Sequence, residues 1–296
     1  MAVYTLIESG AIRVTGTDRL DFVQGQVAQN IKSLPIPGGV RSMILNVKGQ
    51  IEFDVRIYRR SDDLYIQTEA GLSTQVLARL QKYIVFDEVK LEDITNQIQV
   101  VHVSGKGATE LLSSFGFTGN THLLKLEAGT VLISSINRGN GEGFDLHVLK
   151  TKFEILENLL KSNGTSALES EKLEHLRVTS SLPNAHLDGF VGMLPQECGL
   201  LEGVSFKKGC YVGQEIMARL DARGHSNKQL AWVFLEKSLD TGTRVTVDGR
   251  EVGRLGHVVP NHSFGKGFAA LAVIRNDALE KPNLEAGGIK LEIISV

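Results

Sequence analysis

The sequence is poor in cysteine. Its 296 residues include two, Cys198 and Cys210. Two cysteines cannot form the disulfide framework that stabilises many small secreted domains. They stand twelve residues apart, and neither belongs to a closely spaced pair of the kind that binds zinc. We therefore expect reduced thiols, no bound metal and a reducing compartment, which we take to be the cytoplasm.

Long apolar runs and a charge imbalance are also missing. The longest apolar runs, such as residues 269–274, fall far short of the ~20 residues that cross a membrane. Residues 1–10 lack the basic start and apolar stretch of a signal peptide. The 32 basic and 34 acidic side chains leave a net charge of -2, which gives no electrostatic footprint for nucleic acid or an anionic membrane. We expect neither as a direct partner.

Glycine is plentiful, with 31 residues, and predicts many tight turns between short strands. Residues 41–68 have the pattern of a strand meander, and residues 73–84 that of a helix with Ser73 as its N-cap. Residues 151–181 are mostly helical in pattern. Beyond residue 225, short β-rich segments separated by turns predict a small antiparallel barrel. We therefore expect an α+β protein that divides into residues 1–225 and 226–296.

A weak internal repeat lies in the first half of the chain. The stretch VTGTDRLDFVQG begins at Val14, and VSGKGATELLSSF begins at Val103, an offset of 89 residues. Each stretch has the pattern of a strand that ends in glycine and is followed by a helix. Two related α+β subdomains would produce this pattern. Chance would also produce it, because strand–glycine–helix joints are common.

The segment VSFKKGCYVGQE, residues 204–215, places Cys210 after two lysines and Gly209. Apolar residues follow helical spacing across residues 209–220, so we predict a helix there with Cys210 at its start. The helix N-terminus and the lysines would lower the pKa of this thiol below its usual value of about 8.5. Alternatively, Cys210 is a small buried hydrophobe, which is common for free cysteine. Cys198 has no such surroundings, and we interpret it as structural.

Residues 208–215, KGCYVGQE, resemble the signature of the YgfZ family of folate-binding proteins. Further stretches agree with that family: GQVAQNI at residues 25–31, NVKGQIEFDVRIYR at 46–59 and LQKYIVFDEVKL at 80–91. The family's members are tetrahydrofolate-dependent factors for iron–sulfur cluster assembly or repair, with a link to tRNA modification. They are related to the glycine-cleavage T-protein, an aminomethyltransferase. The resemblance implies a three-domain ring around a folate site, with two interwoven α+β domains and a C-terminal β-barrel.

The resemblance also implies site residues and partners. Cys210 would carry the activity with Lys208 beside it, within a motif completed by Gly209, Tyr211, Gly213, Gln214 and Glu215. Tetrahydrofolate would contact Asn46, Asp54 and Arg223. From the residues alone, the first two are more typical of solvated turn residues, and Arg223 is consistent with an ordinary helix stop. The implied partners are a folate and iron–sulfur proteins or their assembly machinery.

Two departures from the wider superfamily bear on function. The T-protein carries a pair of aspartates where this sequence has Phe53 and Asp54, and the superfamily often has a pterin-binding glutamate where this sequence has Thr179. The missing acid removes a proton acceptor and argues against one-carbon transfer. We therefore favour an accessory factor of iron–sulfur metabolism that acts through Cys210. The alternatives are a folate-dependent transferase or demethylase, and a folate-binding module without a reactive thiol.

Overall fold

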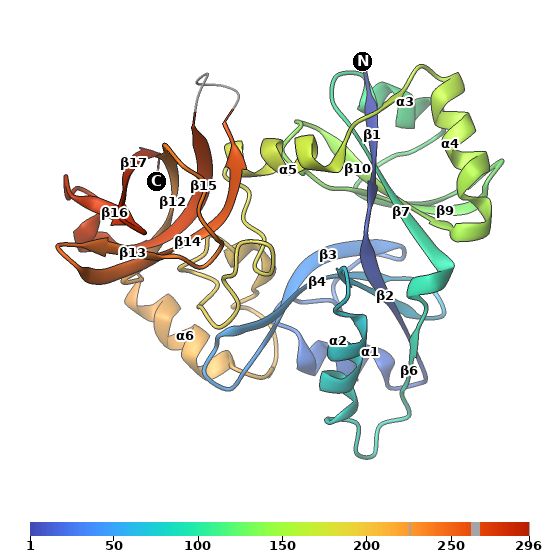
Figure 1. Cartoon of the computed structure of the whole chain (residues 1–296). Helices are drawn as coiled ribbons and strands as arrows, with labels where there is room; N and C mark the ends of the chain where they lie inside the picture. The colour runs from blue at the N-terminus through green and yellow to red at the C-terminus, as the bar shows by residue number, and fades with distance from the viewer. Residues whose placement is uncertain (225, 262–266, 296) are drawn as a thin grey trace.

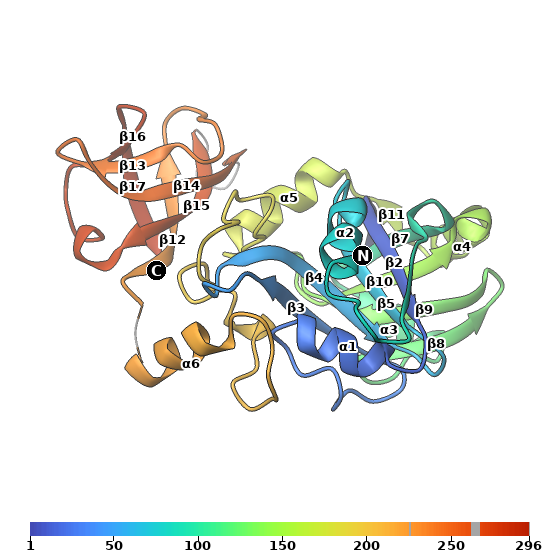
Figure 2. The same ribbon diagram turned by 90° about the horizontal axis from the view of Figure 1, so that it is seen from below.

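Three β-sheets organise the computed structural model, which describes residues 1–224, 226–261 and 267–295 and, at Arg223, the backbone alone (Figures 1 and 2). The five-stranded sheet has the order β3 (Gly38–Leu45), β4 (Ile51–Arg59), β5 (Leu64–Glu69), β2 (Ser9–Thr15) and β6 (Lys90–Asp93). The six-stranded sheet has the order β11 (Ser166–Ala167), β1 (Val3–Ile7), β7 (Ile98–Ser104), β10 (Gly143–Leu149), β9 (Gly129–Ser135) and β8 (Thr121–Leu126).

The third sheet is a closed antiparallel barrel. Its order is β12 (Lys228–Leu235), β15 (Phe268–Arg275), β14 (Arg250–Pro260), β13 (Arg244–Val247), β16 (Leu284–Ala286) and β17 (Ile289–Ser295). Alternate barrel side chains point inward and form a separate core. The predicted α+β class with a C-terminal barrel is confirmed. We propose that the boundary between the two parts of the chain lies near residue 225. Residue 225 itself lies outside the described residues.

Six α-helices occur in the described ranges: α1 (Arg19–Gln26), α2 (Ser73–Gln81), α3 (Ala108–Ser114), α4 (Phe153–Ser162), α5 (Ser170–Thr179) and α6 (Gln214–Arg223). Helices α1 and α2 pack on the five-stranded sheet through one apolar cluster, and α3 and α4 pack on the six-stranded sheet through another. Ser73 is not the N-cap of α2: the cap is Leu72, and the Ser73 hydroxyl donates to Asp93 instead. None of these helices is long and apolar enough to span a membrane.

The internal repeat is visible in the two open sheets. Strand β2 and helix α1 begin 89 residues before β7 and α3, and the glycines that follow the two strands, Gly16 and Gly105, both have positive φ angles of 109° and 87°. The sheets also share an order, since β2-β5-β4-β3 in one matches β7-β10-β9-β8 in the other. The repeat therefore reflects two related subdomains.

The two subdomains exchange strands. Strand β1, at the start of the chain, pairs with β7. Strand β6, which directly precedes β7 in the chain, instead pairs with β2 in the other sheet. Each sheet thus contains a strand that is a neighbour, along the chain, of a strand in the other sheet. This exchange accounts for the interwoven arrangement that the resemblance implied.

Candidate functional site

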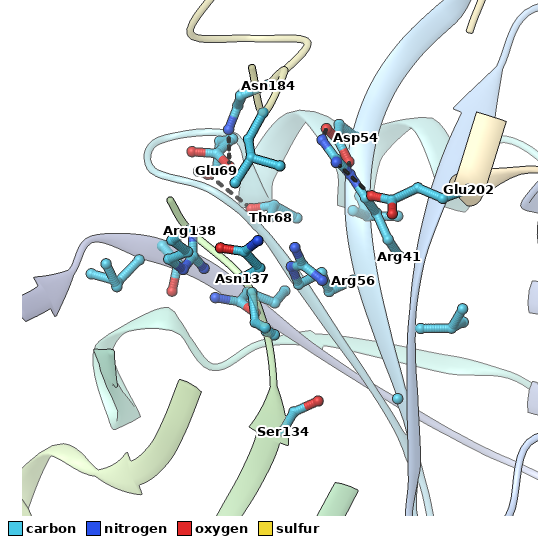
Figure 3. Close-up of a pocket in the computed structure, with 18 of the residues that line it drawn as sticks. Arg41, Asp54, Arg56, Thr68, Glu69, Ser134, Asn137, Arg138, Asn184 and Glu202 are labelled. Atoms are coloured by element: carbon cyan, nitrogen blue, oxygen red, sulfur yellow. Dashed lines mark hydrogen bonds and ion pairs between the residues drawn. The ribbon is translucent and has the colours of Figure 1, made fainter. Parts of the chain in front are cut away.

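A cavity of about 500 Å³ lies between the two open sheets. Its polar side chains come from β3, β4 and β5 on one side and from β9 and the turn after it on the other, and include Arg41, Asp54, Arg56, Gln67, Glu69, Ser134, Asn137 and Arg138 (Figure 3). The segment after α5 adds Asn184. No described residue of the barrel lines this cavity.

The pleat of β4 explains how polar residues reach the cavity. Side chains two apart on a strand share a face, so Asp54, Arg56 and Tyr58 all project into it. Cross-strand pairing extends the row, because Arg56 is opposite Arg41 on β3 and opposite Gln67 on β5. The same strand's alternate residues, among them Val55 and Ile57, face the helices and fill the core.

Asp54, a predicted folate contact, lines the cavity but is already engaged. Arg41 donates from Nε to Oδ1 at 3.0 Å and from Nη2 to Oδ2 at 2.5 Å. The remaining Nη1 of Arg41 donates to Glu202 at 2.8 Å. Burial alone would raise the pKa of Asp54, but the adjacent Arg41 outweighs burial and lowers it. Asp54 is therefore an ionised carboxylate with both oxygens occupied.

Arg138, like Arg41, is held in place by an ion pair with a buried carboxylate. Its guanidinium donates to the fully buried Asp145 at 3.1 Å and 2.6 Å, and His102 Nδ1 lies 2.8 Å from the same carboxylate. Burial would raise the pKa of Asp145, but Arg138 and His102 hold it well below its usual range. This network sets the direction of Arg138 before any ligand arrives.

Asn46 does not line the cavity, and the expectation that it joins Asp54 in one site is wrong. Its side-chain oxygen accepts from the backbone N–H groups of Lys48 at 2.8 Å and Gln50 at 3.1 Å. Asn46 therefore closes the turn between β3 and β4, which is a common task of asparagine in turns. Arg223, the third predicted folate contact, ends α6, and its side chain lies outside the described part of the chain.

The predicted helix after the cysteine begins later than expected. Helix α6 begins at Gln214, and Cys210 is exposed in the irregular segment four residues earlier. Gly209 adopts no left-handed conformation, and a Cβ added there would meet nothing within 4 Å. A close approach occurs instead at Gly213, which has φ 87° and whose added Cβ would lie 2.6 Å from the carbonyl oxygen of Asn46.

Lys208 faces the protein. Its ammonium donates to three backbone carbonyl oxygens at and after the end of α1: Gln24 at 2.5 Å, Val27 at 2.6 Å and Gln29 at 3.2 Å. Burial lowers the pKa of Lys208 to about 8. The ammonium also lies 4.9 Å from the ring centre of the buried Tyr211. Lys208 therefore anchors the cysteine segment, and its catalytic role beside the thiol stays a prediction.

The rest of the motif also builds the segment. The Gln214 side chain accepts from the Tyr211 backbone N–H at 3.3 Å, and Tyr211 packs in the core that joins the barrel to the five-stranded sheet. Glu215 forms a surface ion pair with Arg219. The end of the β3–β4 hairpin lies beside α6 (Figure 1), and Gly213 at the start of that helix meets the hairpin turn. Three of the stretches that carried the resemblance thus meet here, through Lys208 and Gly213.

The predicted site residues therefore fall into two groups. Asp54 lies in the cavity, whereas Cys210 and the other described motif residues lie outside its lining. Sequence reasoning missed the cavity side chains Arg56, Glu69 and Arg138. Arg56 sits within the 46–59 stretch of the resemblance, which was a usable signal. No local pattern marks Glu69. In the described residues, no three His, Cys, Asp or Glu side chains gather as a metal site.

Comparison with known proteins places this fold. The chain superposes on the crystal structure of the glycine cleavage system aminomethyltransferase T from Bartonella henselae with a TM-score of 0.81, covering 100% of this chain and 85% of that one. The sequence identity is 16%, so the likeness concerns the fold. The class is thus that of aminomethyltransferase-like folds with a C-terminal barrel.

Sequence matches are more specific. The profile of the GCVT N-terminal domain matches residues 2–208, and that of the CAF17 C-terminal beta-barrel domain matches residues 227–295. The tRNA-modifying protein YgfZ of Photorhabdus laumondii is 30% identical over 240 residues, 79% of this chain and 70% of its own length. That of Photobacterium profundum is 26% identical over 287 residues, 94% and 84%. The chain belongs to the YgfZ family, within the GCVT N-terminal domain family.

Proposed function

We propose that this chain binds tetrahydrofolate between its two open sheets and serves, through Cys210, as an accessory factor in iron–sulfur cluster assembly or repair. The observation that carries the proposal is the cavity itself. Its volume of about 500 Å³ lies within the usual range for small-molecule sites, and its lining combines carboxylates, amides and guanidinium groups. The family to which the chain belongs supports a folate as the occupant.

The cavity's side chains fit the chemistry of a pterin. An aminopyrimidine edge presents paired N–H donors, which a carboxylate accepts best. Thr179 lies where the superfamily often has a glutamate, but its hydroxyl donates to the carbonyl of His175 at 2.8 Å, outside the cavity lining. Glu69 on β5 offers a carboxylate instead. Its Oε1 accepts from Asn184 at 2.8 Å, and no described residue donates to its Oε2. We assign the pterin edge to Glu69.

The alternative of a one-carbon transferase is less well supported. A general base needs an available lone pair and a pKa near the working pH. Asp54 is poorly suited to this role, because Arg41 bonds to both of its oxygens and lowers its pKa, which makes it a weak base. The adjacent Phe53 is a ring stacked 5.9 Å from His186 and accepts no proton. A folate held here would therefore serve as ligand or co-substrate without proton removal by this pair.

Cys210 supplies the second half of the proposal. Its exposure leaves the thiol open to a partner protein. One thiolate cannot hold an iron–sulfur cluster, which requires about four such ligands. A client protein, another copy or a small thiol would supply the others, which suits transient handling of iron or sulfur. The relatives are named for tRNA modification, and we propose that this chain serves that process through an iron–sulfur client.

Calorimetric titration of tetrahydrofolate tests the folate site. We expect Glu69→Gln to weaken binding about tenfold, because one charge-assisted hydrogen bond to a carboxylate contributes about that factor. The Thr179→Ala variant is the matched control and should bind as the wild type does, since its hydroxyl bonds within α5. Equal effects of both substitutions would place the pterin elsewhere, and no saturable binding to the wild type would refute the folate proposal.

A further inference from the structure

One arginine of the cavity lining forms no ion pair with a carboxylate of the described residues. Three arginines of the lining each pair with a carboxylate: Arg41 with Asp54, Arg138 with Asp145, and Arg177 with Asp188. Arg56 also lines the cavity and is half-buried. Within residues 1–224, 226–261 and 267–295, no side chain forms an ion pair or a hydrogen bond with it. Arg56 is therefore the exception among the arginines of this site.

The position of Arg56 makes this arrangement unfavourable in the free protein. Arg56 stands directly opposite Arg41 across the β3–β4 ladder, and like charges in that position repel. Figure 3 shows Arg41 on one side of Arg56 and Asn137 and Arg138 on the other, in this view. Burial lowers the pKa of Arg56. Tyr58 and Asp145 act in the opposite direction, and Arg138 and Arg41 add to the lowering. Guanidinium groups nevertheless stay charged in proteins.

The nearby carboxylates act on Arg56 from a distance, but none of those in the described residues forms an ion pair with it. Asp54 and Glu202 are both taken by Arg41. Glu69 accepts from Asn184. A half-buried cation without an anion destabilises the folded state unless something else supplies the charge. The space that Arg56 faces is a cavity large enough for a small molecule, so the missing charge can come from a ligand.

We propose that Arg56 is an anion subsite of the cavity and binds a carboxylate of the ligand, which is the glutamate of tetrahydrofolate. This assignment rests on the proposed function for the folate, whereas the anion subsite itself rests on the unpaired guanidinium. The flat fork of Arg56 matches the two oxygens of a carboxylate. Inorganic phosphate presents the same oxyanion chemistry, so the experiment separates the two sources.

The test compares two ligands and two variants by calorimetry. Tetrahydrofolate carries the glutamate, and tetrahydropteroate lacks it. The variant Arg56→Met removes the charge while keeping an apolar side chain of similar reach. The control Arg59→Gln changes an arginine of the same strand outside the cavity lining, which donates to the carbonyls of Lys32 and Leu34. The melting temperature of each free protein is also measured.

We expect Arg56→Met to weaken tetrahydrofolate about tenfold or more, the factor that corresponds to loss of a charge-assisted bond. Its affinity for tetrahydropteroate should stay within about twofold, and Arg59→Gln should leave both affinities unchanged. The free Arg56→Met protein should melt at or above the wild-type temperature, because an unpaired charge has been removed. Equal weakening of both ligands, or a lowered melting temperature, would overturn the carboxylate assignment.

The failure of the folate proposal has a different signature. If the wild type binds neither tetrahydrofolate nor tetrahydropteroate, two further ligands are titrated into the same proteins. These are p-aminobenzoylglutamate and inorganic phosphate. Saturable binding of either that Arg56→Met abolishes and Arg59→Gln preserves would support the anion subsite with another ligand. Binding of phosphate but not of p-aminobenzoylglutamate would overturn the carboxylate assignment. Absence of binding by both would overturn the subsite.

Discussion

At the scale of single residues, the two cysteines occupy opposite environments. Cys198 is fully buried in the core between the barrel and the five-stranded sheet. Burial raises the pKa of the Cys198 thiol well above its usual range, and the neighbouring Glu197 adds to the effect. Cys210 is exposed in the segment before α6. Because thiolates and not thiols react, burial and suppressed ionisation both make Cys198 the less reactive of the two.

We therefore predict that iodoacetamide modifies Cys210 in the native protein and leaves Cys198 unmodified, as read by mass spectrometry of the digested protein. In cells, Cys210→Ala should lower the activity of iron–sulfur enzymes, and Cys198→Ala is the control that should not. Native-state labelling of Cys198 at the rate of Cys210 would contradict the burial argument. Normal iron–sulfur enzyme activity in the Cys210→Ala strain would remove the proposed role of the thiol.

At the scale of elements, the segment before α6 is held at two points. Lys208 binds the carbonyls at the end of α1, where a cation also opposes the negative end of the helix dipole. Gly213 is the N-cap of α6 and sits against the β3–β4 turn. Cys210 lies between these two anchors. The position of the thiol is therefore set by α1 and by the hairpin, and less by the helix that follows it.

Gly213→Ala should destabilise the protein by about 3 kcal/mol, from the left-handed φ together with the clash against the Asn46 carbonyl. Gly224 offers a matched control at the other end of α6. Its φ is 73°, but an added Cβ there would meet nothing within 4 Å, so Gly224→Ala should cost about 1 kcal/mol. Urea unfolding measures both. Equal losses would show that the hairpin contact carries no weight.

Local patterns predicted the elements that local forces determine. Strand β4 spans Ile51–Arg59 as its alternation indicated, and the barrel follows from short β-rich segments between turns. The start of α6 was misplaced because Val212 fits the helical spacing, whereas the left-handed Gly213 interrupts the helix. Whether a glycine adopts that conformation depends on a turn from another part of the chain, which periodicity does not reveal.

The residues that line the cavity were predictable only in part, because their positions also depend on contacts between distant parts of the chain. Asp54 was found because it belongs to a stretch of family resemblance, and Asn46 was included for that reason although its side chain closes its own turn. Glu69 and Arg138 come from different sheets and are 69 residues apart. Only the packing of the two sheets brings them together, and nothing in either local sequence encodes that contact.

At the scale of the whole molecule, a buried polar cluster joins the two open sheets beside the cavity. His147 on β10 lies 3.2 Å from the hydroxyl of Tyr58 and 3.2 Å from that of Tyr65, and the two tyrosines belong to the five-stranded sheet. Both nitrogens of the imidazole are therefore used across the interface. Burial lowers the pKa of His147 from its ordinary 6.5 to about 4.

Because the pKa of His147 is lowered in the folded protein, the stability of the contact between the two sheets depends on pH. The unfolded chain binds a proton at His147 near pH 6.5, whereas the folded protein binds it near pH 4. The contribution of His147 to the free energy of unfolding is therefore fully present above pH 6.5. It is lost as the pH falls toward 4, and the loss amounts to about 3 kcal/mol in total. In His147→Gln this contribution should vanish, so the free energy of unfolding should depend less on pH between 6.5 and 4.

Urea unfolding at several pH values measures this difference. The control is His122→Gln, because the His122 imidazole bonds locally to Thr118 and should leave the wild-type pH dependence in place. A pH dependence in His147→Gln as steep as in the wild type would show that the acid sensitivity lies elsewhere.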